Sequence, residues 1–335
     1  MRKKVLTIML AAVLIMALVA GCGGGGSSTP QNGDAEGEGK QEAKQQEQVF
    51  LNVATGGTAG TYFPLGGALT EIWNKNIPGV NSTAQSTGAS VANINLLKEK
   101  KAEIIFVQND ITYYAANGVE LFEDKYEDLR GLAILYPETI QLVTLGNKGI
   151  NSVEDLKGKR VAVGAAGSGA EANARQILNA AGITYDDISA QYLSFAEAAN
   201  NLKDGNVDAA FLTAGFPTAA VTDIAAQHDL KLISLDDSLV EKLTADYPYY
   251  TMNVIPGGTY SGVDEDIQTV AVQAMLAVTS DLDEELAYNL VKYMYDNLDR
   301  IKAAHSVGEL IKPETGTEGM PVELHPGAQK YFDEL

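Results

Sequence analysis

The sequence is poor in the residues that most often carry chemistry. Cys22 is the only cysteine in 335 residues, so neither an internal disulfide nor a cysteine metal cage can form. Only three histidines are present, and His228, His305 and His325 lie far apart. Lysine and arginine number 24 against 44 aspartates and glutamates, a net charge of −20. Because phosphate binding rests on basic patches, so acidic a chain is a poor candidate for binding nucleic acid.

Motifs of common enzyme and cofactor classes are also missing. The chain has no H-E-x-x-H, no G-x-S-x-G and no G-K-[ST] phosphate loop. A glycine run at Gly164–Gly169 departs from the G-x-G-x-x-G spacing, and its Ser168 has no visible base partner. Acidic residues are abundant, but no spacing among them indicates metal ligands. We therefore expect a protein that is not an enzyme and that holds no cofactor and no metal.

Residues 1–21 have the features of a signal peptide. The basic segment Arg2–Lys4 precedes an apolar run of sixteen residues, which is short for a membrane span. The end of this run, Leu18–Cys22 (L-V-A-G-C), resembles the lipobox of bacterial lipoproteins, in which the signal is cut before the cysteine. The resemblance implies lipidation of Cys22 and an extracytoplasmic protein anchored to the cell membrane. A membrane-spanning anchor or a soluble secreted protein is the alternative.

Residues 22–48 consist of Gly, Ser, Gln and Glu with almost no apolar residue, which predicts a flexible tether. The folded part is therefore expected at 49–335. Without residues 1–21, which hold three basic and no acidic residues, the net charge falls to −23. An anionic ligand would have to be held locally, against the general field of the protein.

Three strand–loop–helix units open the folded part. The apolar run 50–54 leads into a glycine-rich loop at 55–61 and then into a helix. Residues 81–86 and 102–108 are expected to be further strands, each followed by polar residues. Polar residues after such strands are where ligands sit in open α/β sheets, and glycine loops at helix N-termini favour anions. Three such units in about seventy residues indicate a doubly wound α/β sheet.

The pattern is repeated after a long extended segment. Residues 129–145 are too long and too β-rich for an ordinary strand, and Pro137 suits a crossover between two lobes. Further strands are expected at 160–165, 191–194, 209–213 and 230–235, a return crossover at 249–255, and helices at 267–278 and 286–298. We expect an α/β clamshell of the periplasmic-binding-protein type (type II-like) with two crossover hinge strands, in which residues 49–141 and 256–335 form lobe 1 and residues 142–255 form lobe 2.

Seven motifs follow one another through the folded part. They are A-T-G-G-T-A-G-T-Y-F-P-L-G-G-A-L (54–69), S-T-G-A-S-V-A-N (86–93), F-V-Q-N-D (106–110), L-Y-P-E (135–138), D-L-K-G-K-R-V-A-V-G-A-A-G-S-G (155–169), F-L-T-A-G-F-P (211–217) and L-H-P-G-A (324–328). Together and in this order they resemble the TAXI family, the solute receptors of one class of TRAP transporters. Ala59, Thr61 and Phe63 depart from the family's more frequent Gly, Val and Tyr.

The resemblance implies a receptor that delivers its ligand to the membrane permease subunit of a TRAP transporter, driven by an ion gradient. It also implies glutamate, glutamine or a dicarboxylate such as 2-oxoglutarate as the ligand. We also expect the protein to be a monomer. The receptor of an ATP-driven importer would leave similar local signals, and a sensor or enzyme built on this fold is a further alternative.

Ligand-binding residues are expected in the cleft between the lobes. No lysine or arginine lies within the loops, so a carboxylate fits better than a phosphate, and Glu138 at the hinge suits an ammonium group. The predicted set comprises Thr55, Gly57, Thr58, Thr61, Tyr62, Ser86, Thr87, Gln108 and Asn109 from lobe 1, with Tyr136, Glu138, Gly167, Ser168, Gly169 and Thr213 from the hinge and lobe 2.

Overall fold

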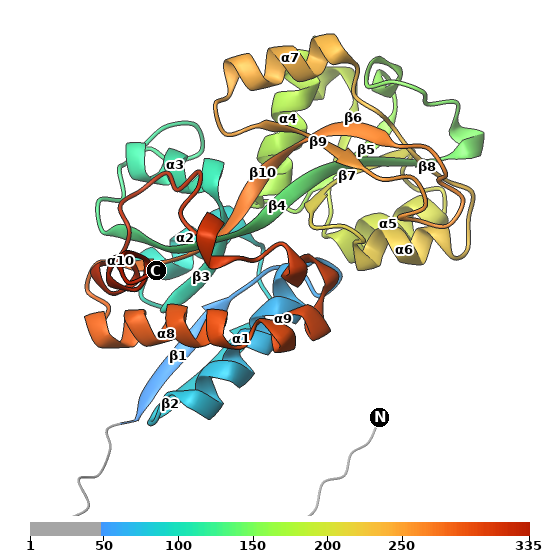
Figure 1. Ribbon diagram of the computed structural model, residues 1–335. Helices are drawn as coiled ribbons and strands as arrows, with labels where there is room; N and C mark the ends of the chain where they lie inside the picture. Colours follow the sequence, from blue (N-terminus) through green and yellow to red (C-terminus); the bar gives the residue numbers. More distant parts are fainter. Residues whose placement is uncertain (1–47) are drawn as a thin grey trace, which may run out of the picture. The chain divides into compact units, whose positions relative to one another are not determined.

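The computed structural model describes residues 48–335 (Figure 1). The predicted signal peptide (1–21), the lipidation site Cys22 and the tether up to residue 47 lie outside these residues. Among the residues described, no helix is long and apolar enough to cross a membrane.

A mixed sheet runs through the described part in the order β2-β1-β3-β10-β4-β7-β5-β6, with β8 paired to β4 and β9 to β10. Each end of the sheet is parallel, and antiparallel pairings of β10 and β4 join the two ends. The strands are β1 (Val49–Ala54), β2 (Val80–Gln85), β3 (Ile104–Gln108), β4 (Leu129–Leu145), β5 (Arg160–Gly164), β6 (Ser189–Tyr192), β7 (Ala209–Ala214), β8 (Leu230–Leu232), β9 (Thr251–Ile255) and β10 (Ile267–Thr279).

Helices cover both faces of each end of the sheet, which confirms the predicted two-lobed α/β fold (Figure 1). In the first half, α1, α8 and α9 cover one face and α2 and α3 the other; in the second half, α4 and α7 lie opposite α5 and α6. The helices are α1 (Tyr62–Asn76), α2 (Ser90–Lys98), α3 (Asn109–Asn117), α4 (Gly169–Ala180), α5 (Phe195–Lys203), α6 (Ala219–Ala225), α7 (Asp237–Asp246), α8 (Glu284–Asp296), α9 (Leu298–Ala304) and α10 (Pro326–Asp333).

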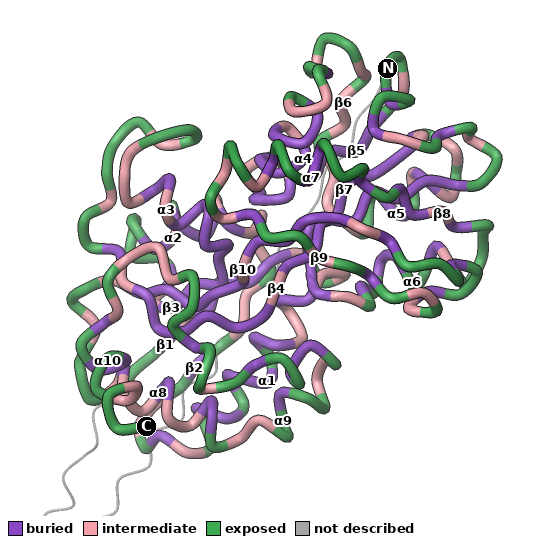
Figure 2. Tube along the Cα trace, turned by 45° about the horizontal axis from the view of Figure 1, so that its top comes forward, coloured by how far each residue is buried: buried purple, intermediate pink, exposed green. Residues whose placement is uncertain are grey.

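Strand β4 connects the two halves, as expected for segment 129–145. It pairs with β10 along most of its length and with β7 only from Thr139 onward. At Pro137 the strand therefore has β10 as a partner but not β7, and proline is tolerated where one side of a strand is free. All of the long strand except Arg130 and Pro137 is buried, and Figure 2 shows β4 and β10 as a mostly buried path between the halves.

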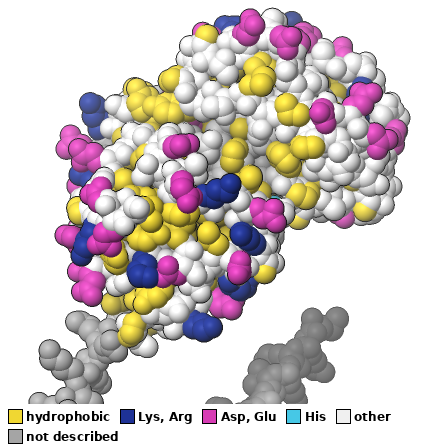
Figure 3. Space-filling model, viewed as in Figure 1, with side chains coloured by type: hydrophobic (Ala, Val, Ile, Leu, Met, Phe, Trp, Pro, Cys, Tyr) yellow, Lys and Arg dark blue, Asp and Glu magenta, His cyan; other side chains and the backbone are white. Residues whose placement is uncertain are grey.

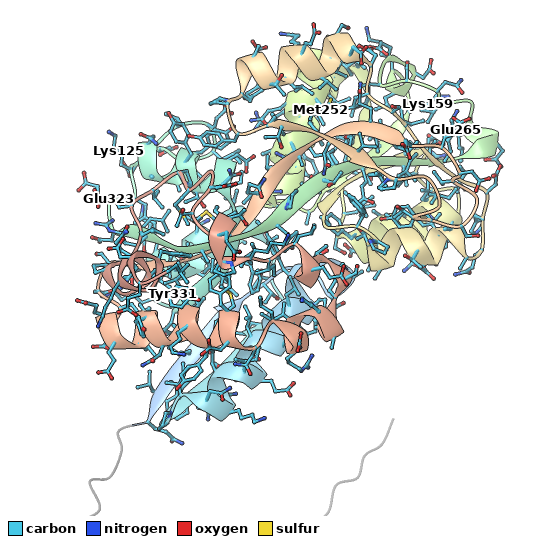
Figure 4. All side chains as sticks on the ribbon, in the orientation of Figure 1. Lys125, Lys159, Met252, Glu265, Glu323 and Tyr331 are labelled. Atoms are coloured by element: carbon cyan, nitrogen blue, oxygen red, sulfur yellow. The ribbon has the colours of Figure 1, made fainter. Side chains whose placement is uncertain are left out.

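The predicted helix at 267–278 is wrong, because these residues form strand β10. Val270, Ala271 and Val272 are fully buried, and a run buried on both faces carries no periodicity that separates strand from helix. Its valines and threonines favour a strand. The return crossover is thus β10, whereas the expected crossover at 249–255 is the outer strand β9, whose Met252 is 61% exposed (Figure 4).

The return to the first half also occurs later in the chain than the expected boundary at residue 256. Tyr260, Val263 and Ile267 pack into the core of the second half, together with residues of β7 and α6. The first-half core takes over within β10, from Ala274 onward.

Candidate functional site

A cavity of about 70 Å³ lies where the two halves meet. One water molecule needs roughly 10–15 Å³ of such space, so the cavity has room for a small polar molecule. Its walls come from the ends of β3 and β7, from the middle of β4 and from the N-terminal ends of α1, α2, α4 and α5. The lining residues are Gly56, Gly57, Gly60, Thr61, Tyr62, Thr87, Gly88, Ala89, Ser90, Gln108, Tyr136, Glu138, Ala165, Ser168, Gly169, Ala170, Ser194, Phe195, Thr213 and Ala214.

Most of the residues predicted for the ligand site line this cavity. They are Gly57, Thr61, Tyr62, Thr87, Gln108, Tyr136, Glu138, Ser168, Gly169 and Thr213. The other predicted residues do not line it and are Thr55, Thr58, Ser86, Asn109 and Gly167.

The predicted residues that do not line the cavity fasten the backbone around it, except for Thr58, which is exposed. The Thr55 hydroxyl donates to the carbonyl of Gln85 at 2.6 Å, and the Ser86 hydroxyl donates to that of Gly56 at 3.0 Å. The side chain of Asn109 ties α3 to Gly319 and to β10. Thr55, Ser86 and Asn109 follow strands and were therefore expected to face a ligand, but their side chains form hydrogen bonds that hold the backbone in place.

The lining hydroxyls of the glycine loops are also already used within the protein. Thr61 Oγ1 donates to the Gly215 carbonyl at 3.2 Å, and Thr87 Oγ1 donates to the Thr55 carbonyl at 2.9 Å. Ser168 Oγ donates to Ala165 at 2.7 Å and accepts from the N–H of Glu171 as the cap of α4. We call this side of the cavity, formed by the lining residues 56–61, 87–90 and 165–170, the loop wall.

The helix N-termini in the loop wall differ in whether their first backbone N–H groups already have a hydrogen-bond acceptor. The first N–H groups of a helix have no partner inside the helix. At α2, the N–H groups of Val91 and Ala92 donate to the carbonyl of Gly167 from the other half. At α4, the Ser168 side chain takes up the N–H of Glu171, two residues after Gly169. The N-termini of α1 and α4 are therefore better placed than that of α2 to receive an anion.

The rest of the cavity lining includes polar side chains from β3, β4, β7 and the start of α1. Five of their atoms are buried without a hydrogen-bond partner: Tyr62 Oη, Gln108 Oε1, Tyr136 Oη, Glu138 Oε1 and Thr213 Oγ1. Within residues 48–335 only Arg175 and Tyr295 have such an atom elsewhere. Buried polar atoms are almost always paired, so five unpaired atoms around one cavity indicate a polar occupant. We call these five residues the polar floor.

Glu138 is the only Asp, Glu, Lys, Arg or His that lines the cavity within the described part of the chain. It is 2% exposed, and burial raises the pKa of its carboxyl to about 8, although interactions with Tyr62 and Gln108 lower it. Burial also raises the pKa of Tyr62 and Tyr136 well above the usual value. The viewed face of residues 48–335 carries acidic side chains on both halves (Figure 3). The cavity therefore offers a cation or a hydrogen-bond donor a partner in Glu138.

Sequence reasoning missed Ser90, Ser194 and Phe195, which also line the cavity. Ser194 and Glu197 form a capping box at the start of α5, and the S-x-x-E pattern at 194–197 was visible in the sequence. Phe195 packs against Gly60 across the cavity, where an added Cβ would lie 3.4 Å from its ring. Nothing in the sequence pairs Phe195 with the first loop.

Solved structures with this fold share little sequence with the chain. A protein from Bordetella bronchiseptica RB50 is 17% identical, with 86% of this chain and 82% of that chain covered and a TM-score of 0.53. PhnD1 from Prochlorococcus marinus (MIT 9301), solved in complex with methylphosphonate, is 13% identical, with 78% and 90% covered and a TM-score of 0.52. The alkanesulfonate-binding protein SsuA from Xanthomonas axonopodis pv. citri, bound to MOPS, is 13% identical, with 86% and 84% covered and a TM-score of 0.48.

A family model places the chain more directly. The model of the NMT1-like family matches residues 53–335, which is nearly all of the part that the structure describes. The chain belongs to the NMT1-like family and has the α/β fold of two-lobed periplasmic solute-binding proteins.

Proposed function

We propose that the chain is an extracytoplasmic solute-binding protein that captures a small molecule in the cavity between its halves. The observation that carries the proposal is the polar floor, in which five buried atoms have no partner and all face one cavity. A bound polar molecule would pair them. The lining side chains include no histidine and no cysteine among the residues described, which supports binding without chemistry.

The chemistry of the walls favours a zwitterionic amino acid with an acidic side chain, glutamate first. Glu138 and the Gln108 carbonyl oxygen suit an ammonium group, while the N-termini of α1 and α4 suit carboxylates. No lysine or arginine lines the cavity in the described residues, so a doubly charged phosphonate lacks a cationic partner. Glutamine and dicarboxylates such as 2-oxoglutarate are second choices.

Thermal unfolding of the full chain with a panel of ligands tests this function. Ligand at about 100 times its Kd adds roughly 2.7 kcal/mol to the free energy of unfolding. Glutamate, glutamine, 2-oxoglutarate, methylphosphonate, an alkanesulfonate and a neutral sugar make up the panel. We expect glutamate to raise the unfolding temperature most. Stabilisation by the sugar or the alkanesulfonate alone would refute the proposed ligand class.

We propose that the partner is the permease subunit of a TRAP transporter, because the TAXI-like motifs extend over most of the folded part. The L-Y-P-E motif contributes Tyr136 and Glu138 to the cavity, and F-L-T-A-G-F-P contributes Thr213 and Ala214. The genes beside the coding sequence test this assignment. A multi-helix permease gene supports it, whereas an ATPase gene with a Walker motif assigns the receptor to an ATP-driven importer.

We also propose that a lipid on Cys22 anchors the protein to the cell membrane, on the strength of the L-V-A-G-C lipobox. Radiolabelled fatty acid added to growing cells should label the wild-type protein but not Cys22→Ser. Equal labelling of both proteins would place the lipid elsewhere.

A further inference from the structure

Gln108 lines the cavity, and its side-chain carbonyl oxygen lies close to Gly169, which lines the same cavity. Its amide nitrogen donates to Glu138 Oε2 at 3.2 Å and to Asn173 Oδ1 at 3.1 Å. An amide nitrogen carries two protons, so both are used. The remaining atom, Oε1, is buried, has no partner and belongs to the polar floor. Gln108 therefore presents an acceptor to whatever occupies the cavity.

The orientation of Asn173 fixes that of Gln108. Asn173 lies on α4 in the other half of the molecule and is fully buried. Its amide nitrogen donates to Asp110 Oδ2 and to Tyr250 Oη, each at 2.9 Å. Tyr250 gives its own proton to Gln176 at 2.6 Å, so its oxygen is an acceptor for Asn173. With its nitrogen on this side, Asn173 turns its oxygen toward Gln108.

Asp110 is the group that sets the direction of this chain of amides. An ionised carboxylate only accepts hydrogen bonds, so the neighbouring Asn173 must turn its nitrogen toward it. Asp110 is 1% exposed, and its other oxygen accepts from the N–H of Ile111 at 2.8 Å. Burial raises the pKa of Asp110 to about 6, which leaves the carboxylate ionised at pH 7. Asp110 does not itself line the cavity.

We infer that Asp110 is a positioning residue for ligand selection: acting through Asn173 and Gln108, it makes the cavity select a ligand with a hydrogen-bond donor at this point. The inference rests on the proposed function and adds to it the residue that separates an amino acid from its keto acid. Glutamate and 2-oxoglutarate differ at one group, which is a donor in the first and an acceptor in the second. The direction of the amides favours the donor.

The test compares the affinities of the wild-type chain and Asp110→Asn for glutamate and 2-oxoglutarate by calorimetry at pH 7. The introduced amide has a donor as well as an acceptor, so Asp110 no longer fixes the direction of Asn173, and only the acceptors Tyr250 and Glu138 still hold the two amides. We expect the ratio of glutamate to 2-oxoglutarate affinity to fall about tenfold, the equivalent of one hydrogen bond to a charged group. Asp299→Asn, at an exposed position on α9, is the control and should leave the ratio unchanged.

An unchanged ratio in Asp110→Asn, with the thermal unfolding temperature within a few degrees of the wild type, would overturn the inference. A general loss of structure would weaken both ligands alike, so the ratio separates selection from folding.

A second measurement needs no ligand. The side-chain amide signal of Gln108, identified by its loss in Gln108→Glu, should shift in the NMR spectrum of Asp110→Asn and not in that of Asp299→Asn. If the wild-type protein binds neither compound, the proposed function is at fault and this spectrum decides the inference. If the Gln108 amide signal had the same chemical shift in Asp110→Asn as in the wild type, the proposed coupling from Asp110 through Asn173 to Gln108 would be refuted.

Discussion

The loop wall and the polar floor line one cavity and meet at Gly169 and Gln108, but they use their polar groups in opposite ways. In the loop wall, the hydroxyls of Thr61, Thr87 and Ser168 all donate to backbone carbonyls. In the polar floor, Thr213 and Glu138 each keep a buried oxygen without a partner. A hydroxyl in the right place is therefore a poor sign of ligand contact. What distinguishes the floor is that its groups are buried and still unpaired.

Because of this difference, the loop wall and the polar floor should contribute to ligand binding in different ways. The loop wall supplies backbone N–H groups and brings the halves close together, because its hydroxyls are already used to shape the loops. The floor supplies buried side-chain atoms that lack a well-formed hydrogen bond within the protein, and an unsatisfied buried group costs about 1–3 kcal/mol. Changes in the floor should consequently alter affinity and ligand choice, whereas changes in the loop wall should alter closure and stability.

The largest expected effect is on the pH dependence of stability, and it comes from Glu138. Its pKa in the folded protein is about 8, above the ordinary value of 4.5, so the folded state binds this proton more tightly than the unfolded state. The stability contributed by the proton is fully present below about pH 4.5 and is lost as the pH rises toward 8. Glu138→Gln should gain about 4 kcal/mol relative to the wild type between pH 4.5 and pH 8.

Urea unfolding of both proteins at several pH values measures this difference. The comparison with Glu138→Gln cancels the titration of the other carboxylates. A difference between the two proteins that is the same at pH 4.5 and pH 8 would mean that Glu138 is ionised in the folded state throughout.

The next effect is on affinity. Hydrogen bonds to charged groups contribute about 1.5–3 kcal/mol, so Glu138→Gln should weaken glutamate binding between about tenfold and about 100-fold. Calorimetry of glutamate binding measures the loss. Thr58→Ala is the control, since Thr58 was predicted to bind ligand but is exposed outside the cavity. Equal losses in the two variants would contradict the assignment of the floor.

A comparable but smaller effect is expected where the loop wall touches the floor. A Cβ on Gly169 would lie 1.5 Å from Gln108 Oε1, so only glycine lets the halves approach this closely. Gly169→Ala should weaken glutamate binding by about 1–3 kcal/mol, because overpacking of this size must push the halves apart. Small-angle scattering should show less compaction with ligand than in the wild type. Normal compaction would mean that Gln108 moves aside at little cost.

The sequence predicted the elements whose pattern is local. The first strand was expected at 50–54, its glycine loop at 55–61 and a helix directly after the loop, and all three lie there. An apolar run, a group of glycines and an amphipathic stripe each indicate one kind of structure. Strand β10 was predicted as a helix because burial on both faces removes the periodicity. A strand in the middle of a sheet can be identified only from the strands that pair with it, and two of those that pair with β10, β3 and β4, lie far away in the sequence.

The site was predictable to the same extent. Polar residues after strands gave Gln108, and the L-Y-P-E motif gave Tyr136 and Glu138, all in the cavity. Whether a hydroxyl has a partner depends on which carbonyl the fold brings next to it. The Thr55 hydroxyl donates to a carbonyl, whereas the Thr213 hydroxyl has no partner. The role of Asn173 depends on contacts between the halves, which no local pattern records.

The smallest expected effect comes from removing a hydroxyl of the loop wall. The single proton of the Thr87 hydroxyl is shared between the Thr55 carbonyl at 2.9 Å and Asn93 Oδ1 at 2.6 Å, and Thr87 Oγ1 also accepts from the N–H of Ala89, so it holds the loop before α2. Thr87→Val keeps the shape of the side chain and should cost about 1 kcal/mol of stability, the usual net value of a hydrogen bond. Because this hydroxyl is already used, the Kd for glutamate should change less than about threefold, a difference of under 1 kcal/mol.

Thr213→Val, which removes an unpaired hydroxyl of the floor, should do the reverse and weaken binding with little loss of stability. Urea unfolding and calorimetry on both variants test the pair. If Thr87→Val weakened binding more than Thr213→Val, the loop wall would contact the ligand through its hydroxyls, and the division between the two sides of the cavity would be wrong.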